Sequence, residues 1–385
     1  MPFCAVPFIH SYVDTKGKNM VCCAYKFDSH IHDLQDWKGK EYQKLRKAML
    51  TEDQEWLPGC DECKRKEANG GTDKNKSARL VFNNFYKHIG EPSVDIVTGN
   101  VFEAPLSYDL RMNNLCNLSC RMCGASASSQ IWKEAQKYPE LWPAFANDDE
   151  KKYNSMDITR IIDEAETMRE IKLLGGEPTV QPEAKAILQR LIDVGNTSLG
   201  MNVTTNGTNI NSKFYELLTQ FKRVFITVSI DNYGKGHEYI RGPAADFETI
   251  WKNVKKIYEL NWPGDIFVEI NQTVMTFNIF DFWRLRQEAN KQYPWCTFRS
   301  DMVFQPEMYS PQYIPGKWKD IAIEKAKLNN AYDDEKHIFD LIEETETNMK
   351  IVRRLKNYTP IMDFVRNQHL KDHFPITYEL FKGLK

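Results

Sequence analysis

The feature that most constrains the fold of this chain is a regular alternation of strand-like and helix-like segments over residues 104–304. Each short strand-like run is followed by an amphipathic stretch, which is the pattern of βα units in a parallel sheet. The predicted strands are Leu106–Met112, Glu170–Leu174, Leu199–Thr204, Val224–Ile230, Ile266–Val274 and Thr297–Phe304. The predicted helices are Ala125–Lys137, Asp157–Met168, Pro182–Val194, Ser212–Lys222, Phe247–Leu260 and Ile279–Lys291. Six βα units in succession predict an α/β fold, either doubly wound or curled into an incomplete barrel.

The positions of polar motifs favour the barrel. In parallel α/β folds the active site lies at the carboxyl ends of the strands. The motifs at those ends are, in chain order, a cysteine-rich loop, Gly175-Gly-Glu-Pro178, Thr205-Asn-Gly207, Ser229 with Asp231, Gln272 and Asp301. Six successive strands that bring distinctive residues to one rim indicate a curled sheet with a shared mouth, a partial (β/α)6 TIM-like barrel.

The cysteine-rich loop carries three thiols, Cys116, Cys120 and Cys123, in the spacing Cys-x3-Cys-x2-Cys. This arrangement suits a cubane [4Fe-4S] cluster, which takes one Cys per iron and here would leave the fourth iron open to a small molecule. A zinc ribbon instead needs Cys-x2-Cys pairs and a closed four-ligand shell. The alternatives for the loop are three buried structural cysteines or half of a zinc site.

The triplet resembles the cluster loop of the radical S-adenosylmethionine (SAM) enzymes, and with the downstream motifs the resemblance covers about residues 104–304. It implies that the open iron binds the amino and carboxylate groups of SAM. An electron from the reduced cluster would then break the sulfonium C–S bond and give a 5′-deoxyadenosyl radical. The resemblance also implies an electron donor of the flavodoxin or ferredoxin type.

Gly175, Gly176, Glu177 and Pro178 look like the family motif that binds the SAM amino group. Two glycines let the backbone approach a ligand closely, and the proline stiffens the exit from the turn. Glu177 would offer its carboxylate to the ammonium group. An isolated Gly-Gly-Glu-Pro would be an ordinary turn, but this one lies one βα unit after the cysteine triplet.

Ser229, followed by Asp231 and then Arg241, resembles the ribose-contacting serine and the carboxylate-binding arginine of the family. The guanidinium fork suits a carboxylate, although Arg241 could equally be a surface charge beside a loop. Asn206 is a weaker candidate for the SAM site because Asn-Gly is a common turn. Met122 stands where many relatives carry an aromatic residue against the adenine, and a thioether can pack there too.

A second set of cysteines precedes the barrel: Cys4, Cys22, Cys60 and Cys63. The set resembles the SPASM or twitch segment of radical SAM enzymes, which usually follows the barrel and holds an auxiliary iron–sulfur cluster. Four thiolates would ligate such a second [4Fe-4S] cluster fully, so it would transfer electrons or hold structure. A structural zinc is the alternative, and Cys23 could replace Cys22 as a ligand.

Three regions are therefore predicted: residues 1–100 as the auxiliary-cluster region, 104–304 as the barrel and 305–385 as a helical extension. Within the extension, helices are expected over Lys319–Asn329 and Glu335–Leu355. A substrate radical that is oxidised also needs a base, and Asp301 on the sixth strand is the candidate. Cys296, before that strand, is predicted to be a structural cysteine.

Composition limits the function classes further. Lys and Arg total 51 against 53 Asp and Glu, so a net charge of −2 provides no general attraction to nucleic acid. No apolar run approaches a membrane span, and a cytoplasmic protein is expected, whose nine cysteines would be metal ligands more than disulfides. Peptide modification is the first hypothesis, small-molecule dehydrogenation of a sugar or nucleotide the second, and a non-catalytic metal-binding or electron-transfer protein the third.

Overall fold

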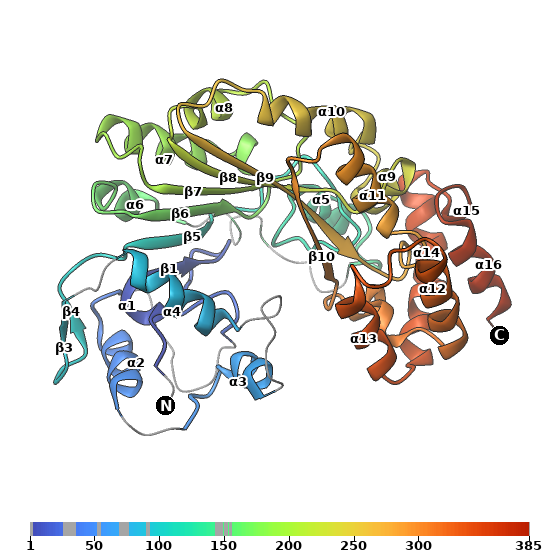
Figure 1. Ribbon diagram of the computed structural model, residues 1–385, viewed down its shortest axis with the longest axis horizontal. Coiled ribbons are helices and arrows are strands. Elements are labelled where there is room, and N and C mark those ends of the chain that lie inside the picture. The colour runs from blue at the N-terminus through green and yellow to red at the C-terminus, as the bar shows by residue number, and fades with distance from the viewer. Residues whose placement is uncertain are drawn as a thin grey trace.

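The fold is given by a computed structural model, which describes residues 3–25, 36–51, 55–68, 77–89, 93–142, 149, 153 and 156–384. Its centre is a curved sheet with helices on one side (Figure 1). The N-terminal and C-terminal segments lie on the opposite side, at the two ends of the sheet.

The sheet has eight strands in the order β10-β9-β8-β7-β6-β5-β1-β2. Strands β5 to β10 are parallel and lie side by side in chain order, so the predicted α/β fold with a parallel sheet is confirmed. They are β5 (Ser107–Arg111), β6 (Glu170–Leu174), β7 (Gly200–Thr205), β8 (Arg223–Ser229), β9 (Asp265–Val274) and β10 (Thr297–Met302).

Helices cover one face of this sheet. Apolar side chains that alternate along the strands, such as Leu110, Ile171 and Val224, pack against helix residues such as Leu188 and Val254 in a common core. The helices that connect the strands are α5 (Ser129–Lys137), α6 (Thr159–Asp163), α7 (Pro182–Asp193), α8 (Lys213–Leu218), α9 (Lys235–Arg241), α10 (Phe247–Tyr258) and α11 (Trp283–Gln292), with a 3₁₀ helix η2 (Pro178–Val180). The strand residues between the apolar ones face away from this core and are largely polar.

The N-terminal segment contributes two strands to the same sheet. Strand β1 pairs in parallel with β5, from His10 opposite Ser107 to Val13 opposite Leu110. Its elements are α1 (Val6–Ile9), β1 (His10–Val13), β2 (Asn19–Met20), α2 (Lys40–Leu50), α3 (Asp61–Ala68), α4 (Ala78–Ile89), β3 (Val94–Asp95) and β4 (Asn100–Val101). The boundary expected near residue 104, between the N-terminal region and the barrel, therefore separates β1 from β5 in the sequence although the two strands pair in one sheet.

The C-terminal segment is helical and has its own core, which includes Phe277, Trp318 and Phe339. Its elements are η3 (Glu307–Tyr309), η4 (Pro311–Tyr313), α12 (Gly316–Leu328), α13 (Lys336–Glu344), α14 (Met349–Arg366), α15 (Leu370–His373) and α16 (Pro375–Gly383).

The prediction of one helix over Glu335–Leu355 was wrong. The chain leaves the helical conformation at Thr345, and Asn348 starts α14 by accepting hydrogen bonds from the N–H groups of Lys350 and Ile351. None of the described helices is long and apolar enough to cross a bilayer.

Candidate cluster and cofactor site

The three cysteines of the Cys-x3-Cys-x2-Cys motif lie on the loop between β5 and α5. Cys116 and Cys120 are buried, and Cys123 is half-buried. The Ser128 hydroxyl fastens the loop, since it donates to the Leu118 carbonyl at 2.6 Å and accepts from the first N–H groups of α5. A helix-capping residue thus ties the middle of the loop to the helix that follows it.

The three thiols influence one another. A hydrogen bond from Cys123 lowers the pKa of the Cys120 thiol, and the same bond raises the pKa of Cys123. Burial, with a smaller effect of the neighbouring Cys120, raises the pKa of Cys116 to about 12. Nη1 of Arg241 lies 3.9 Å from Sγ of Cys120. A cation at this distance favours the thiolate, which is the form that binds metal.

The donor set fits a [4Fe-4S] cluster with one open iron, because three thiols share a loop beside a cation. Within the described ranges, no group of three or more His, Cys, Asp or Glu side chains is arranged to hold a single metal ion. Gly242, at the end of α9, has a φ of +96°, and a Cβ there would lie 2.7 Å from Oγ of Ser119. A glycine is therefore needed where α9 meets the cysteine loop.

Arg241 and Asp231 form a buried ion pair behind this loop. Nε and Nη2 of Arg241 donate to Asp231 at 2.8 and 3.1 Å, and Asp231 is 0% exposed. Burial alone would lower the pKa of Arg241, but the Asp231 carboxylate outweighs it and raises that pKa. Asp231 also accepts from the N–H of Thr273 at 2.9 Å. Two guanidinium nitrogens are thus bonded to Asp231, and the third, Nη1, is turned toward Cys120.

The two glycines of the Gly-Gly-Glu-Pro loop lie against the cysteine loop. Gly175 and Gly176 have φ values of +79° and +51°. A Cβ at Gly175 would lie 2.7 Å from Cβ of Arg111, and one at Gly176 would lie 2.3 Å from the Leu115 carbonyl oxygen. Only glycine allows this approach of the two loops.

Glu177 is 1% exposed and joins the loops after β6 and β7. Its carboxylate accepts from Oγ1 of Thr205 at 2.7 Å, from N of Asn206 at 2.7 Å and from Oγ1 of Thr179 at 2.8 Å. Burial raises the pKa of Glu177, and these hydrogen bonds oppose that rise. Because protein groups already bond both oxygens, this carboxylate holds the two loops together, while Pro178 begins η2 behind it.

Asn206 links the third strand's loop to the cysteine loop. Its Nδ2 donates to Oδ1 of Asn117 at 2.8 Å, and its Oδ1 accepts from Oγ1 of Thr208 at 2.6 Å. Asn117, which lies next to Cys116, donates in turn to Thr208 at 2.8 Å. The structure therefore brings the predicted residue Asn206 to the cysteine loop.

The remaining predicted residues are Ser229, Met122 and Asp301. Ser229 is 9% exposed at the end of β8, and Met122 packs against both large cores. Asp301 lies on the edge strand β10, opposite Thr273 of β9. Its side chain is 58% exposed and pairs with Arg299 at 3.2 Å.

The residue that sequence reasoning missed is Arg121, between the second and third cysteines. It is 1% exposed, and its guanidinium pairs with Asp363 of α14 at 2.8 Å, donates to the Tyr239 carbonyl at 2.8 Å and lies 3.8 Å from the Tyr239 ring centre. Its backbone N–H donates to the Ile240 carbonyl at 2.8 Å. An arginine inside a buried cysteine loop indicates a buried acid nearby, but the partner lies 242 residues away.

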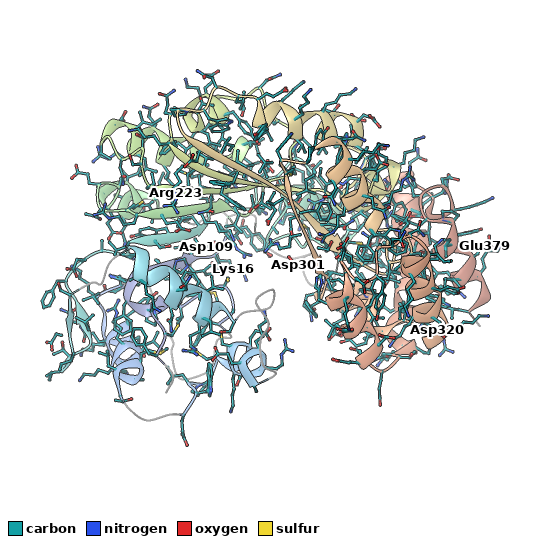
Figure 2. All side chains as sticks on the ribbon, viewed as in Figure 1. Lys16, Asp109, Arg223, Asp301, Asp320 and Glu379 are labelled. Carbon is teal, nitrogen blue, oxygen red and sulfur yellow. The ribbon has the colours of Figure 1, made fainter. Side chains whose placement is uncertain are left out.

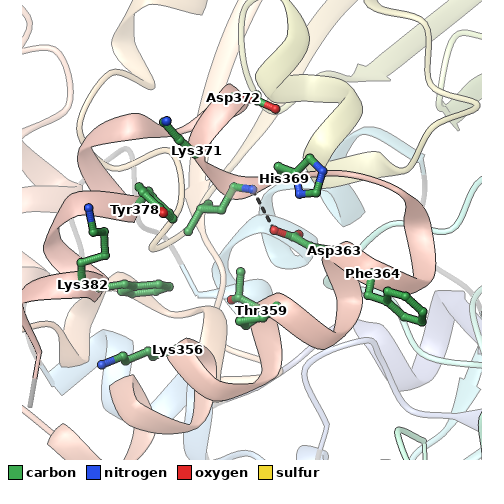
Figure 3. A pocket seen from close by; sticks show the side chains of 12 residues that line it. Lys356, Thr359, Asp363, Phe364, His369, Lys371, Asp372, Tyr378 and Lys382 are labelled. Atoms are coloured by element: carbon green, nitrogen blue, oxygen red, sulfur yellow. Dashed lines mark hydrogen bonds between the residues drawn. The ribbon is translucent and has the colours of Figure 1, made fainter.

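Asp363 also borders a cavity of about 570 Å³ between α14, α15 and α16 (Figure 3). Leu370 and Tyr378 belong to its wall, and the Leu370 N–H donates to Asp363 at 2.7 Å. One carboxylate thus connects the cavity wall to the cysteine loop.

The structure also brings the four predicted N-terminal cysteines together. Cys4, Cys22, Cys60 and Cys63 line one cavity of about 20 Å³. Burial raises the pKa of Cys4 and of Cys60 to about 12. Cys23 is exposed and does not line this cavity. A cavity of this size holds about one water molecule, so a bound cluster would require the thiols to separate. Four thiols that line one cavity are a donor set of the kind that ligates a cluster or zinc.

Residues 110–289 match the model of the Radical SAM superfamily. The matched range contains the three cysteines of the loop, the Gly-Gly-Glu-Pro motif and Arg241. The part of the chain from residue 110 to residue 289, slightly under half of its length, is therefore similar to the radical SAM superfamily enzymes.

Particular relatives show the extent of this likeness. The chain is 27% identical over 169 residues to the sporulation killing factor maturation protein SkfB of Bacillus subtilis, covering 44% of this chain and 37% of SkfB. It is 28% identical over 181 residues to a probable GTP 3′,8-cyclase of Pyrococcus horikoshii, covering 46% of this chain and 50% of the cyclase. The chain therefore matches half or less of each of these curated relatives. Among solved structures, Streptococcus suis SuiB matches with a TM-score of 0.38 and 14% identity over 82% of this chain and 61% of SuiB.

Proposed function

We propose that this chain binds a [4Fe-4S] cluster through Cys116, Cys120 and Cys123 and reductively cleaves SAM to abstract a hydrogen atom from a substrate. When bound, the reduced cluster supplies the electron that breaks the sulfonium C–S bond. The observation that carries this proposal is the radical SAM match over a loop with three mutually interacting thiols. A flavodoxin- or ferredoxin-type protein would supply the electron.

The surrounding residues would orient SAM. Gly175 and Gly176 allow the backbone to approach its amino group, and Nη1 of Arg241 is the guanidinium nitrogen left to reach its carboxylate. Ser229 would contact the ribose and Met122 would pack on the adenine. Asp301, exposed on the edge strand, would serve as the base in an oxidative outcome.

The first test is anaerobic. The protein is reconstituted with iron and sulfide, mixed with SAM and dithionite, and 5′-deoxyadenosine is quantified by mass spectrometry beside a Cys116→Ala control. The wild type is expected to form the product and the control to form at least about a hundredfold less, because an iron without its thiolate ligand cannot hold the cluster. Equal background levels from a wild type that holds a reduced cluster would refute the proposal.

The substrate class that we propose is a peptide. The likeness to the sporulation killing factor maturation protein supports it, since that protein's name describes the processing of a killing factor. The likeness to the probable GTP 3′,8-cyclase supports a second candidate, a nucleotide or another small molecule. The two relatives match at nearly the same identity, so residues of this chain must distinguish the classes.

We further propose that Cys4, Cys22, Cys60 and Cys63 hold an auxiliary [4Fe-4S] cluster of the SPASM or twitch type, with zinc as the alternative. Support comes from their common cavity. Arg79 lines the same cavity and pairs with Glu67 at 2.5 Å, so a cation lies beside thiols that would become anionic on binding a metal.

Neighbouring cysteines provide a matched pair of variants for this second site. The wild type is expected to bind about eight irons per chain, Cys22→Ala about four and Cys23→Ala about eight, since each cubane contributes four. Iron, sulfide and zinc are measured per chain. A content of one zinc and four irons per wild-type chain would show that these four cysteines bind zinc and not a cluster. If Cys23→Ala lost iron and Cys22→Ala did not, Cys23 would be the ligand in place of Cys22.

A further inference from the structure

The face of the sheet that is turned away from the helices carries a row of four polar side chains, two of them charged. Tyr12, Asp109, Lys172 and Asn202 lie opposite one another on β1, β5, β6 and β7. Residues in register across neighbouring strands project from the same face. Figure 2 shows Asp109 on this side of the sheet, and Asp301 lies on the same side farther along.

Asp109 is unusual because one oxygen of its buried carboxylate has no hydrogen-bond partner among the residues that the structure describes. It is 6% exposed, and its Oδ1 has no partner among the described residues. Burial raises its pKa, while Lys172 and Arg111 oppose that rise. An unsatisfied buried oxygen of this kind is costly unless a ligand bonds to it.

Two cations accompany Asp109, and neither is neutralised by an ion pair in the part of the chain that the structure describes. Arg111 projects two residues farther along β5, and its Nε is also buried without a hydrogen bond, although its guanidinium lies 5.2 Å from the Tyr12 ring centre. Lys172 is exposed in the middle of the sheet. Arg111 and Lys172 are thus two cations on either side of Asp109, and guanidinium and ammonium groups suit a carboxylate.

The other acids on this face already have partners. Glu170 accepts from Nδ2 of Asn202 at 3.0 Å, and Glu269 and Asp301 pair with Arg299 at 3.6 and 3.2 Å. Among the described residues these contacts involve neither Arg111 nor Lys172, although Glu170 keeps its charge because Asn202 is neutral. Oδ1 of Asp109 and Nε of Arg111, two buried polar atoms without a partner among the described residues, both lie on β5, the strand that leads into the cysteine loop.

The row lies close to the proposed radical source. Arg111 ends β5, Cys116 follows five residues later, and Gly175 packs directly on Arg111. A substrate held by Arg111 would thus sit at the base of the loop beside which SAM is proposed to bind.

From these contacts we propose that Arg111 and Lys172 bind a carboxylate of the substrate and that Asp109 accepts a hydrogen bond from an adjacent substrate N–H. This inference rests on the proposed function. It assigns the substrate as a peptide with a carboxylate in the segment that binds on this face of the sheet. The carboxylate could belong to an acidic side chain or to the C-terminus of the peptide, since both present the same anion.

Saturation-transfer NMR on the reconstituted protein tests this binding without any turnover. The probes are N-acetyl-glutamate amide, its neutral isostere N-acetyl-glutamine amide, and N-acetyl-glutamine with a free carboxyl terminus. At least one carboxylate probe is expected to bind about fivefold more tightly than the neutral amide. A preference for the first probe assigns an acidic side chain, and a preference for the third assigns the C-terminus.

The variants Lys172→Met and Arg111→Met are expected to lose this preference, and Arg299→Met is expected to keep it. Arg299 is the matched control because it lies on the same face but is already paired with Glu269 and Asp301. Lys172 is exposed, so its replacement leaves the core packing intact. Equal binding of all three probes, or a preference that survives in Lys172→Met and Arg111→Met, would overturn the inference. Because no SAM is cleaved in this assay, its result is separate from that of the cleavage assay.

Discussion

Replacing Asp363 with Ala is expected to reduce the iron bound by the cysteine loop and to lower 5′-deoxyadenosine formation by about tenfold or more. The reason is the position of Arg121, which is 1% exposed between two of the proposed cluster ligands and pairs with Asp363 at 2.8 Å. Removing one partner of a buried pair leaves an uncompensated charge and costs about 3–5 kcal/mol. The loop can avoid that cost by moving Arg121 toward water, which displaces Cys120 on one side.

Glu335→Ala is the matched control for this variant. Glu335 is 0% exposed, pairs with Arg286 at 2.6 Å and, like Asp363, ties the C-terminal segment to the barrel, but it does not contact the cysteine loop. Both variants are expected to unfold at lower denaturant concentration. Only Asp363→Ala should lose iron and SAM cleavage, as measured by iron analysis and mass spectrometry.

Equal iron content in the two variants would show that the C-terminal segment supports overall stability and not the cysteine loop. A loss in Asp363→Ala alone would give residues 305–385 a defined role. They would act as a support that holds the metal-binding loop from behind.

Much of the fold could be predicted from local patterns. Strand β6 has the predicted bounds, Glu170–Leu174, and α7 begins at the predicted Pro182, because proline is favoured in the first turn of a helix. Because parallel strands present their carboxyl ends at one rim, the sequence also predicted that the loops with Gly176 and Asn206 lie near the cysteine loop, and both contact it in the structure.

What could not be predicted depends on long-range packing. The pairing of β1 with β5 follows from a four-residue strand whose sequence, His10–Val13, has no alternation that identifies its neighbour. The orientation of Cys22 toward the other thiols and of Cys23 away from them depends on the local turn. The break between α13 and α14 has a signal in the sequence, because Asn348 is a residue type that often begins a helix. The helical periodicity on both sides of the break nevertheless favours one continuous helix.

Asp231→Asn is expected to destabilise the protein by about 3 kcal/mol or more, because it removes the charge that compensates Arg241 in a buried site. Asp231 is 0% exposed and bonds both Nε and Nη2 of Arg241, as well as the N–H of Thr273. Asp301→Asn is the matched control, since Asp301 also pairs with an arginine but is 58% exposed. Its effect should stay within about 1 kcal/mol. Denaturant unfolding of both variants at neutral pH provides the comparison.

The double variant Asp231→Asn, Arg241→Gln separates the charge from the shape of the site. If an uncompensated cation causes the loss, removing that cation as well should restore part of the stability, so that the double variant is more stable than Asp231→Asn alone. If the double variant is less stable, the hydrogen bonds of Arg241 matter more than its charge. The stability of Asp231→Asn would equal that of Asp301→Asn only if water reached the ion pair. In that case Arg241 would be free to leave Asp231 for the carboxylate of SAM. The expected large difference in stability between Asp231→Asn and Asp301→Asn instead means that Arg241 stays paired with Asp231 and offers only Nη1 to a ligand.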